Sequence, residues 1–220
     1  MMWDNDMFVM ILQGILETFY MTLFSTFLAY VIGLPLGIAL VVTEDTSLMP
    51  CKVVNKILNL IVNIIRSIPF LIFLIFIQPL TKKIVGTTIG STATVVPLVL
   101  AAAPFIGRMV ESSIKELDKG IIEAALSMGA SPMQVIWKVM LPETKPSLWI
   151  GAAISATTIL GYSAMAGFTS GGGLGDIAIR YGFYRYQTDV MFVTVILLIL
   201  IVQCIQEVGM KIANKQDKRK

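Results

Sequence analysis

The sequence lacks histidine altogether, contains only two cysteines among its 220 residues, and has only 14% charged residues. Without histidine, most serine–histidine, cysteine–histidine and histidine-ligated metal sites cannot form. Cys51 lies beside a loop and Cys204 lies within an apolar run, so the sequence indicates neither a disulfide framework nor a metal site. An intramembrane protease or transferase is therefore disfavoured, and we expect no catalytic residue, cofactor-binding residue or metal ligand in this chain.

Charge is scarce because long apolar runs dominate the sequence. Hydrophobic residues make up 56% of it and its mean hydropathy is +0.81, whereas soluble domains carry roughly 25% charged residues. A run as long as residues 18–43, if it is helical, can cross a hydrocarbon core about 30 Å thick. The sequence thus predicts an all-α integral membrane protein with five transmembrane helices, at about residues 18–43, 57–80, 93–110, 147–168 and 190–209.

Basic residues are distributed unevenly over the segments between these spans. Four of them lie on one side of the predicted topology, namely Lys82, Lys83, Arg180 and Arg185. The other Lys and Arg residues, including those of the basic tail 211–220, lie on the opposite side. Because segments rich in Lys and Arg stay in the cytoplasm, we expect an outer N-terminus and a cytoplasmic C-terminus. This distribution also explains the net charge of +3 without a nucleic acid as partner.

Two features inside the spans are candidates for a functional role. Arg66 interrupts the second span, and a charge within a membrane is a functional candidate by default. Its side chain could instead extend to the interface or pair with a carbonyl group near Pro69. The fourth span is rich in Gly, Ala, Ser and Thr, which suits a pathway or a subunit interface better than a lipid-facing shell. We expect the pathway to be lined by Arg66, Ser155, Thr158, Ser163 and Met165.

A glycine-rich run, Ser170–Gly175, follows the fourth span. It has no Gly-Lys-Ser/Thr ending and no dinucleotide-binding spacing, so we do not interpret it as a phosphate-binding loop. Glycines permit close turns of the backbone. We therefore expect residues 169–189 to form an ordered loop on the outer side.

The polar segment 118–142 lies between the third and fourth spans and is too short and too charged to cross a bilayer. Apolar residues at helical spacing predict two short amphipathic helices within it. Gly129 suits a tight reversal between them, and Pro132 suits the first position of the second helix. Ser131 and Gln134 have the spacing of a capping box. Small residues along the first helix and the turn leave room for a partner, so we predict a docking element.

The segment also carries a motif at fixed spacing. The order Glu123-Ala124-Ala125, then Gly129, then Val139-x-Leu141-Pro142 resembles the EAA signature of binding-protein-dependent ABC importer permeases, with Val139 in place of the more frequent Ile. The resemblance extends over about residues 14–210. Within that family the chain is similar in particular to permeases of the methionine importer type, and the runs that carry this similarity include 66–70, 102–106, 128–134 and 161–165.

This resemblance implies the type I ABC importer permease fold, in which the segment 118–142 is a cytoplasmic coupling helix seated in a cleft of a separate ATPase subunit. The coupling residues that it implies are Glu123, Ala124, Ala125, Gly129, Ser131, Pro132, Leu141 and Pro142. It further implies a homodimer of this chain in the bacterial cytoplasmic membrane, with two ATPase subunits and an extracytoplasmic substrate-binding protein. ATP and Mg²⁺ would be held by the ATPase subunits. The expected function is ATP-driven import of an amino acid, methionine.

An ion-coupled secondary amino-acid carrier is the alternative. Such carriers usually have a carboxylate or histidine relay near the middle of the membrane, and many have an internal repeat. Glu17 and Glu207 lie near span ends instead, and no internal repeat is visible in the sequence. Dependence of uptake on ATP, rather than on an ion gradient, would separate the two functions.

Overall fold

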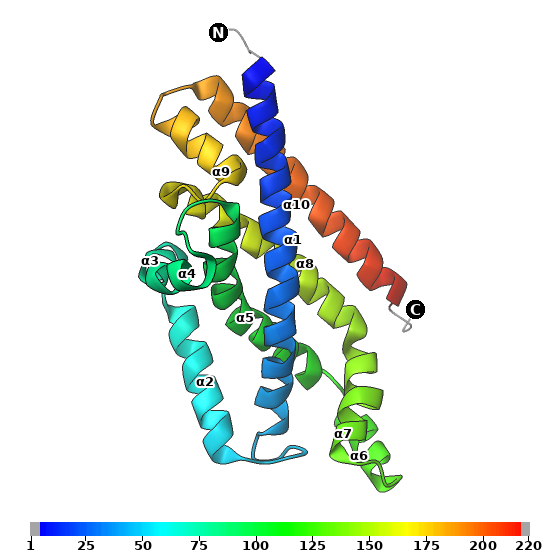
Figure 1. Cartoon of the computed structure of the whole chain (residues 1–220). Helices are drawn as coiled ribbons and strands as arrows, with labels where there is room; N and C mark the ends of the chain where they lie inside the picture. Colours follow the sequence, from blue (N-terminus) through cyan, green and yellow to red (C-terminus); the bar gives the residue numbers. More distant parts are fainter. Residues whose placement is uncertain (1–4, 217–220) are drawn as a thin grey trace.

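The computed structural model describes residues 5–216, and helices dominate it (Figure 1). Four of the described helices are long and apolar enough to cross a membrane, and one bent pair supplies a fifth span if it is counted as a unit. The prediction of an all-α membrane protein is confirmed. In chain order the elements are α1 (Asn5–Val42), α2 (Lys52–Ser67), α3 (Phe70–Phe76), α4 (Gln78–Val85), α5 (Ser91–Lys115), α6 (Lys119–Ser127), α7 (Pro132–Val135), the π-helix η1 (Ile136–Met140), α8 (Leu141–Met165), the 3₁₀-helix η2 (Ala166–Thr169), α9 (Gly173–Ile177), the π-helix η3 (Ala178–Phe183) and α10 (Thr188–Gln216).

The centre of the molecule is the packing of α1 against α5. Gly33 and Gly37 are four residues apart and therefore lie on one face of α1. A Cβ atom at Gly33 would lie 2.7 Å from Ile106 Cγ2, and one at Gly37 would lie 2.5 Å from the carbonyl oxygen of Gly107. Both glycines thus let the two backbones approach closely, which is how helices associate in a membrane, where no hydrophobic force drives them together.

The segment 57–80, expected as one span, is broken in the structure. Helix α2 ends at Ser67, α3 begins at Phe70, and the helices are bent by 103° relative to each other. Pro69 disfavours the helical region for the residue before it, and Ile68 accordingly has an extended backbone with φ −86° and ψ 124°. Helices α3 and α4 then lie crosswise beside α5 (Figure 1), so α4 occupies part of the expected outer connection.

The first and last spans extend well beyond their predicted bounds. Helix α1 begins at Asn5 rather than near residue 18, and its 38 residues correspond to about 57 Å, well beyond a hydrocarbon core of about 30 Å. Helix α10 continues to Gln216, so the first part of the predicted basic tail is helical. The rest of that tail, 217–220, and residues 1–4 lie outside the described residues.

The segment 169–189, expected as an outer loop, is largely helical and partly buried. Helix α9 packs against α1 and α8, and Leu174 is completely buried. Two side chains of α1 accept hydrogen bonds from the first backbone N–H groups of α9: Glu17 Oε2 from Gly173 at 2.7 Å, and Thr18 Oγ1 from Leu174 at 2.9 Å. These contacts satisfy backbone groups at the start of a helix, so the glycine-rich run can order against α1.

Candidate functional site

The turn between α6 and α7 is specified by its own residues. Asp118 caps α6 by accepting a hydrogen bond from the backbone N–H of Gly120 at 2.8 Å. Gly129 has φ +83°, a left-handed conformation that glycine adopts at little cost. The predicted capping box is present, since Ser131 and Gln134 each accept a hydrogen bond from the backbone N–H of the other. The reversal is thus held by local chemistry.

One face of this segment is anchored in the core and the other is exposed. Ala125 is buried in a core cluster that also contains Val135, Ile136 and Met140. Among the other residues of the EAA-like pattern and turn, Glu123, Ala124, Gly129, Ser131 and Pro142 are exposed, whereas Pro132, Val139 and Leu141 are half-buried. The turn therefore presents a surface made mostly of small side chains.

Three large apolar side chains in the same segment are exposed. Met128, Met133 and Trp137 are 83%, 57% and 61% exposed, whereas other apolar residues of the same segment are buried in the core. Their sequence pattern gave no sign of a site, because apolar residues at helical spacing are ordinarily buried. Exposed apolar residues within one short segment indicate an interaction surface. We include them in the candidate docking surface.

The turn between α6 and α7 is joined to a membrane span without interruption. The fourth span was predicted to start near residue 147, but the helical segment runs from Pro132 to Thr169. At the junction lies η1, where the N–H of Leu141 bonds the carbonyl oxygen of Ile136, five residues earlier. Such π segments occur frequently at functional sites. The turn is therefore connected to α8 through one continuous helical segment.

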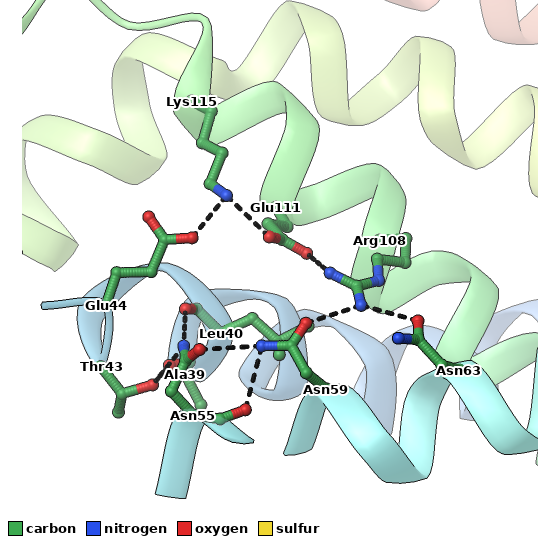
Figure 2. A network of polar contacts seen from close by, with 10 residues as sticks. All are labelled: Ala39, Leu40, Thr43, Glu44, Asn55, Asn59, Asn63, Arg108, Glu111 and Lys115. Carbon is green, nitrogen blue, oxygen red and sulfur yellow. Dashed lines mark hydrogen bonds and ion pairs between the residues drawn. The ribbon is translucent and has the colours of Figure 1, made fainter. Parts of the chain in front are cut away.

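A polar network, which the sequence analysis did not predict, connects α1, α2 and α5 (Figure 2). Asn55, Asn59 and Asn63 lie four residues apart on α2 and share a face. Asn55 donates to the carbonyl oxygen of Leu40 at 2.7 Å, whereas Asn59 and Asn63 accept hydrogen bonds from Nη2 of Arg108 at 2.6 and 2.9 Å. The regular four-residue spacing of three asparagines among apolar residues is the sequence feature that could have indicated this network.

The charged part of the network centres on Glu111, which is 7% exposed. It accepts a hydrogen bond from Arg108 at 2.6 Å and another from Lys115 at 2.8 Å. Lys115 also pairs with Glu44, beyond the end of α1, at 2.6 Å. Loss of one partner of a buried charge is strongly destabilising, so this network fixes α2 and the end of α1 against α5.

Comparison with known proteins agrees with this architecture. The family model described as binding-protein-dependent transport system inner membrane component matches residues 33–208. The chain belongs to this family. The resemblance inferred from the EAA-like motif is thereby confirmed.

Curated relatives and solved structures extend the comparison. The probable D-methionine transport system permease protein MetI of Vibrio cholerae is 45% identical over 210 residues, covering 96% of this chain and 93% of that protein. The D-methionine transport system permease protein MetI of Escherichia coli is 47% identical over 167 residues, covering 76% and 74%. A structure of the MetNI methionine ABC transporter in inward-facing conformations matches with a TM-score of 0.96 and 43% identity, covering 98% of this chain and all of that one. An amino acid ABC transporter at 16% identity, with a TM-score of 0.78, shares the fold.

The pathway residues predicted on α8 fall into two groups, which differ in how much of each residue is exposed. Ser155 and Ser163 are 0% and 1% exposed, and each donates to a carbonyl oxygen of α8 itself, of Gly151 and Leu160 respectively. Their side chains are therefore enclosed within the subunit in this structure, whereas they were expected to line a pathway. Composition describes the helix as a whole and does not indicate which of its faces packs inside the subunit.

The other predicted residues of α8 lie on an accessible side. Thr158 is half-buried and Met165 is 47% exposed. Between them Gly161 is exposed, and no heavy atom lies within 4 Å of the position that its Cβ would take. These residues recur at three- and four-residue intervals and so form one stripe along α8.

Arg66 lies in the last turn of α2, directly before the bend at Pro69. Its side chain is exposed, and the described part of the chain provides no hydrogen-bond or ion-pair partner for it, so pairing with a carbonyl group near Pro69 is not observed. An unpaired cation next to a break in a membrane helix remains a candidate for function.

Proposed function

We propose that this chain is the membrane-spanning subunit of an ATP-driven importer that carries methionine into the cytoplasm. The observation that carries the proposal is the exposed, locally capped turn 128–131, which is continuous with α8 through η1. Such a turn can receive motion from a partner and pass it to a span. Methionine as cargo is supported by similarity over nearly the whole chain to permeases named for D-methionine transport.

The proposed assembly contains two copies of this chain, two cytoplasmic ATPase subunits and an extracytoplasmic substrate-binding protein. ATP and Mg²⁺ are bound by the ATPase subunits. The chain lies in the cytoplasmic membrane of a bacterium with the coupling turn and C-terminus inside and the N-terminus outside, as the distribution of basic residues indicates.

Coupling to the ATPase is assigned to the turn and the residues beside it. Glu123, Ala124, Gly129, Ser131 and Pro142 offer an exposed and mostly small surface, and Ala125, Pro132 and Leu141 hold that surface in place. Met128, Met133 and Trp137 add apolar area that a cleft in the partner can cover. Closure of the ATPase subunits then moves the turn and, with it, α8.

The pathway is assigned to the exposed stripe of α8, with Thr158 and Met165, and to Arg66 near the bend of α2. A stripe of weakly polar side chains lets a zwitterion pass without strong pairing. Cargo affinity in this subunit is therefore low, and selectivity rests mainly with the binding protein.

Uptake measurements on one reconstituted preparation test the proposal. The chain is copurified with its ATPase and placed in proteoliposomes with the binding protein, and uptake of labelled L- and D-methionine is followed. We expect uptake only with ATP and Mg²⁺ inside, and no loss of uptake when ionophores abolish the proton and sodium gradients. Uptake that follows an ion gradient and ignores ATP would instead identify a secondary carrier.

A further inference from the structure

A cavity of about 520 Å³ opens at the end of the molecule opposite the coupling turn. It lies between the first half of α1 and the segment that contains α9 and η3, both near the top of Figure 1. Its polar lining includes Gln13, Glu17, Ser170, Asp176 and Arg180. In the proposed orientation this is the outer face, where the binding protein docks.

Asp176 lines this cavity and has a buried carboxylate oxygen without a hydrogen-bond partner in the described part of the chain. It is 2% exposed, and its Oδ2 accepts hydrogen bonds from Nε of Arg180 at 2.9 Å and from Nη2 of the same side chain. Its Oδ1 is buried and has no hydrogen-bond partner in the described part of the chain. A buried carboxylate oxygen without a partner is costly, so this atom has unused capacity to accept a hydrogen bond.

The second carboxylate of the cavity is already engaged. Glu17 Oε2 accepts from the backbone N–H of Gly173, and Oε1 accepts from Nε2 of Gln13 at 2.9 Å. Glu17 therefore serves to hold α9 against α1, and its negative charge still faces the cavity. Asp176 is the group with capacity for a ligand.

The charges that line the cavity are those of Glu17, Asp176 and Arg180, so negative charge is in excess. The hydrogen bond with Asp176 raises the pKa of the Arg180 guanidinium, which therefore stays protonated. Arg180 nevertheless has 58% of its side chain exposed, whereas 3% of the Asp176 side chain is exposed. The buried part of the cavity is thus acidic and its cationic group lies toward solvent.

We infer that this cavity receives a basic side chain, lysine or arginine, from the extracytoplasmic binding protein. A cationic nitrogen group would donate to Oδ1 of Asp176 and offset the excess negative charge. The cavity is lined by α1, the start of α5 and the segment 170–181, and none of its lining residues belongs to α8, where the cargo pathway is proposed. A docked protein therefore fits this site better than passing cargo. The inference rests on the proposed function, because it requires a binding protein.

Two substitutions with opposite expected effects test the inference. In the wild-type complex, reconstituted in lipid nanodiscs, binding of the methionine-type binding protein is measured at two salt concentrations. Asp176→Asn removes the negative charge and should weaken binding about tenfold, as expected for loss of one charge pair. Arg180→Gln leaves the carboxylate without its internal partner and should strengthen binding several-fold. Asp6→Asn, which removes an exposed charge near the start of α1, should leave the affinity unchanged.

The sign of the Arg180→Gln effect decides between docking and a structural role. If Asp176 only holds η3 through its ion pair with Arg180, both substitutions weaken binding alike, and the inference is overturned. Equal affinity of wild type and Asp176→Asn also overturns it. Failure of the wild-type complex to bind the binding protein or to import methionine is a separate result, which contradicts the proposed function itself.

Discussion

Gly129 has φ +83°, and no heavy atom lies within 4 Å of the position that its Cβ would take. A side chain at this residue therefore meets open space within the subunit, and its internal cost is confined to the backbone, about 1 kcal/mol. If an ATPase subunit covers the turn, the same side chain also blocks docking. A substitution at Gly129, compared with one at a glycine of similar φ outside the turn, can therefore distinguish backbone strain from loss of the interface with the ATPase.

Gly129→Leu is predicted to abolish import and the stimulation of ATP hydrolysis by the binding protein. Gly86 supplies a matched control, because it has φ +86° and equally open surroundings but lies after α4, away from the turn. Gly86→Leu has the same backbone strain and should retain most of the import rate. Rates of import and ATP hydrolysis are compared in proteoliposomes at equal protein content. A similar loss in both variants would attribute the effect to strain and leave the docking role unsupported.

At the scale of one element, α8 combines a buried face and an accessible stripe. Ser155 and Ser163 belong to the buried face, and Met165 belongs to the stripe. Replacement by tryptophan should therefore have different consequences on the two faces. A buried site has no room for the indole ring, so the fold is disturbed, whereas an exposed site can accommodate it.

Met165→Trp is predicted to reduce methionine uptake at least tenfold while basal ATP hydrolysis is largely kept, because the ring narrows the pathway and leaves the coupling turn unchanged. Ser163→Trp should lower both activities and the yield of assembled complex. Met210→Trp is the control, since Met210 on α10 is 44% exposed, close to the 47% of Met165. Normal uptake by Met165→Trp would move the pathway away from this stripe.

At the scale of the whole molecule, the ends of α1 and α10 define the orientation in the membrane. Asp6 and Lys215 are exposed near the first and last described residues. In a chain with Cys51→Ser and Cys204→Ser, we predict that Asp6→Cys reacts with an impermeant maleimide added outside intact cells. Lys215→Cys should react only after the membrane is permeabilised. Reaction of both from the same side would require an even number of membrane crossings and would contradict the proposed topology.

Sequence alone determined the features that depend on neighbouring residues. Ser131, Pro132 and Gln134 specify the start of α7, because a capping box is formed within four residues. Apolar runs indicated the four long apolar helices, because a hydrocarbon core is crossed by long stretches with little charge, but they did not indicate the break between α2 and α3. The EAA-like spacing identified the family for the same reason: its residues lie within one short segment.

The tertiary structure decided what depends on residues far apart in the chain. Only packing against the rest of the subunit placed Ser155 and Ser163 inside it, and only the approach of α2 to α5 brought Asn59 to Arg108. Likewise, α1 orders the glycine-rich run through Glu17, which is 156 residues away from Gly173. Each of these arrangements is set by which helix faces meet, and composition and periodicity describe a helix without stating its neighbours.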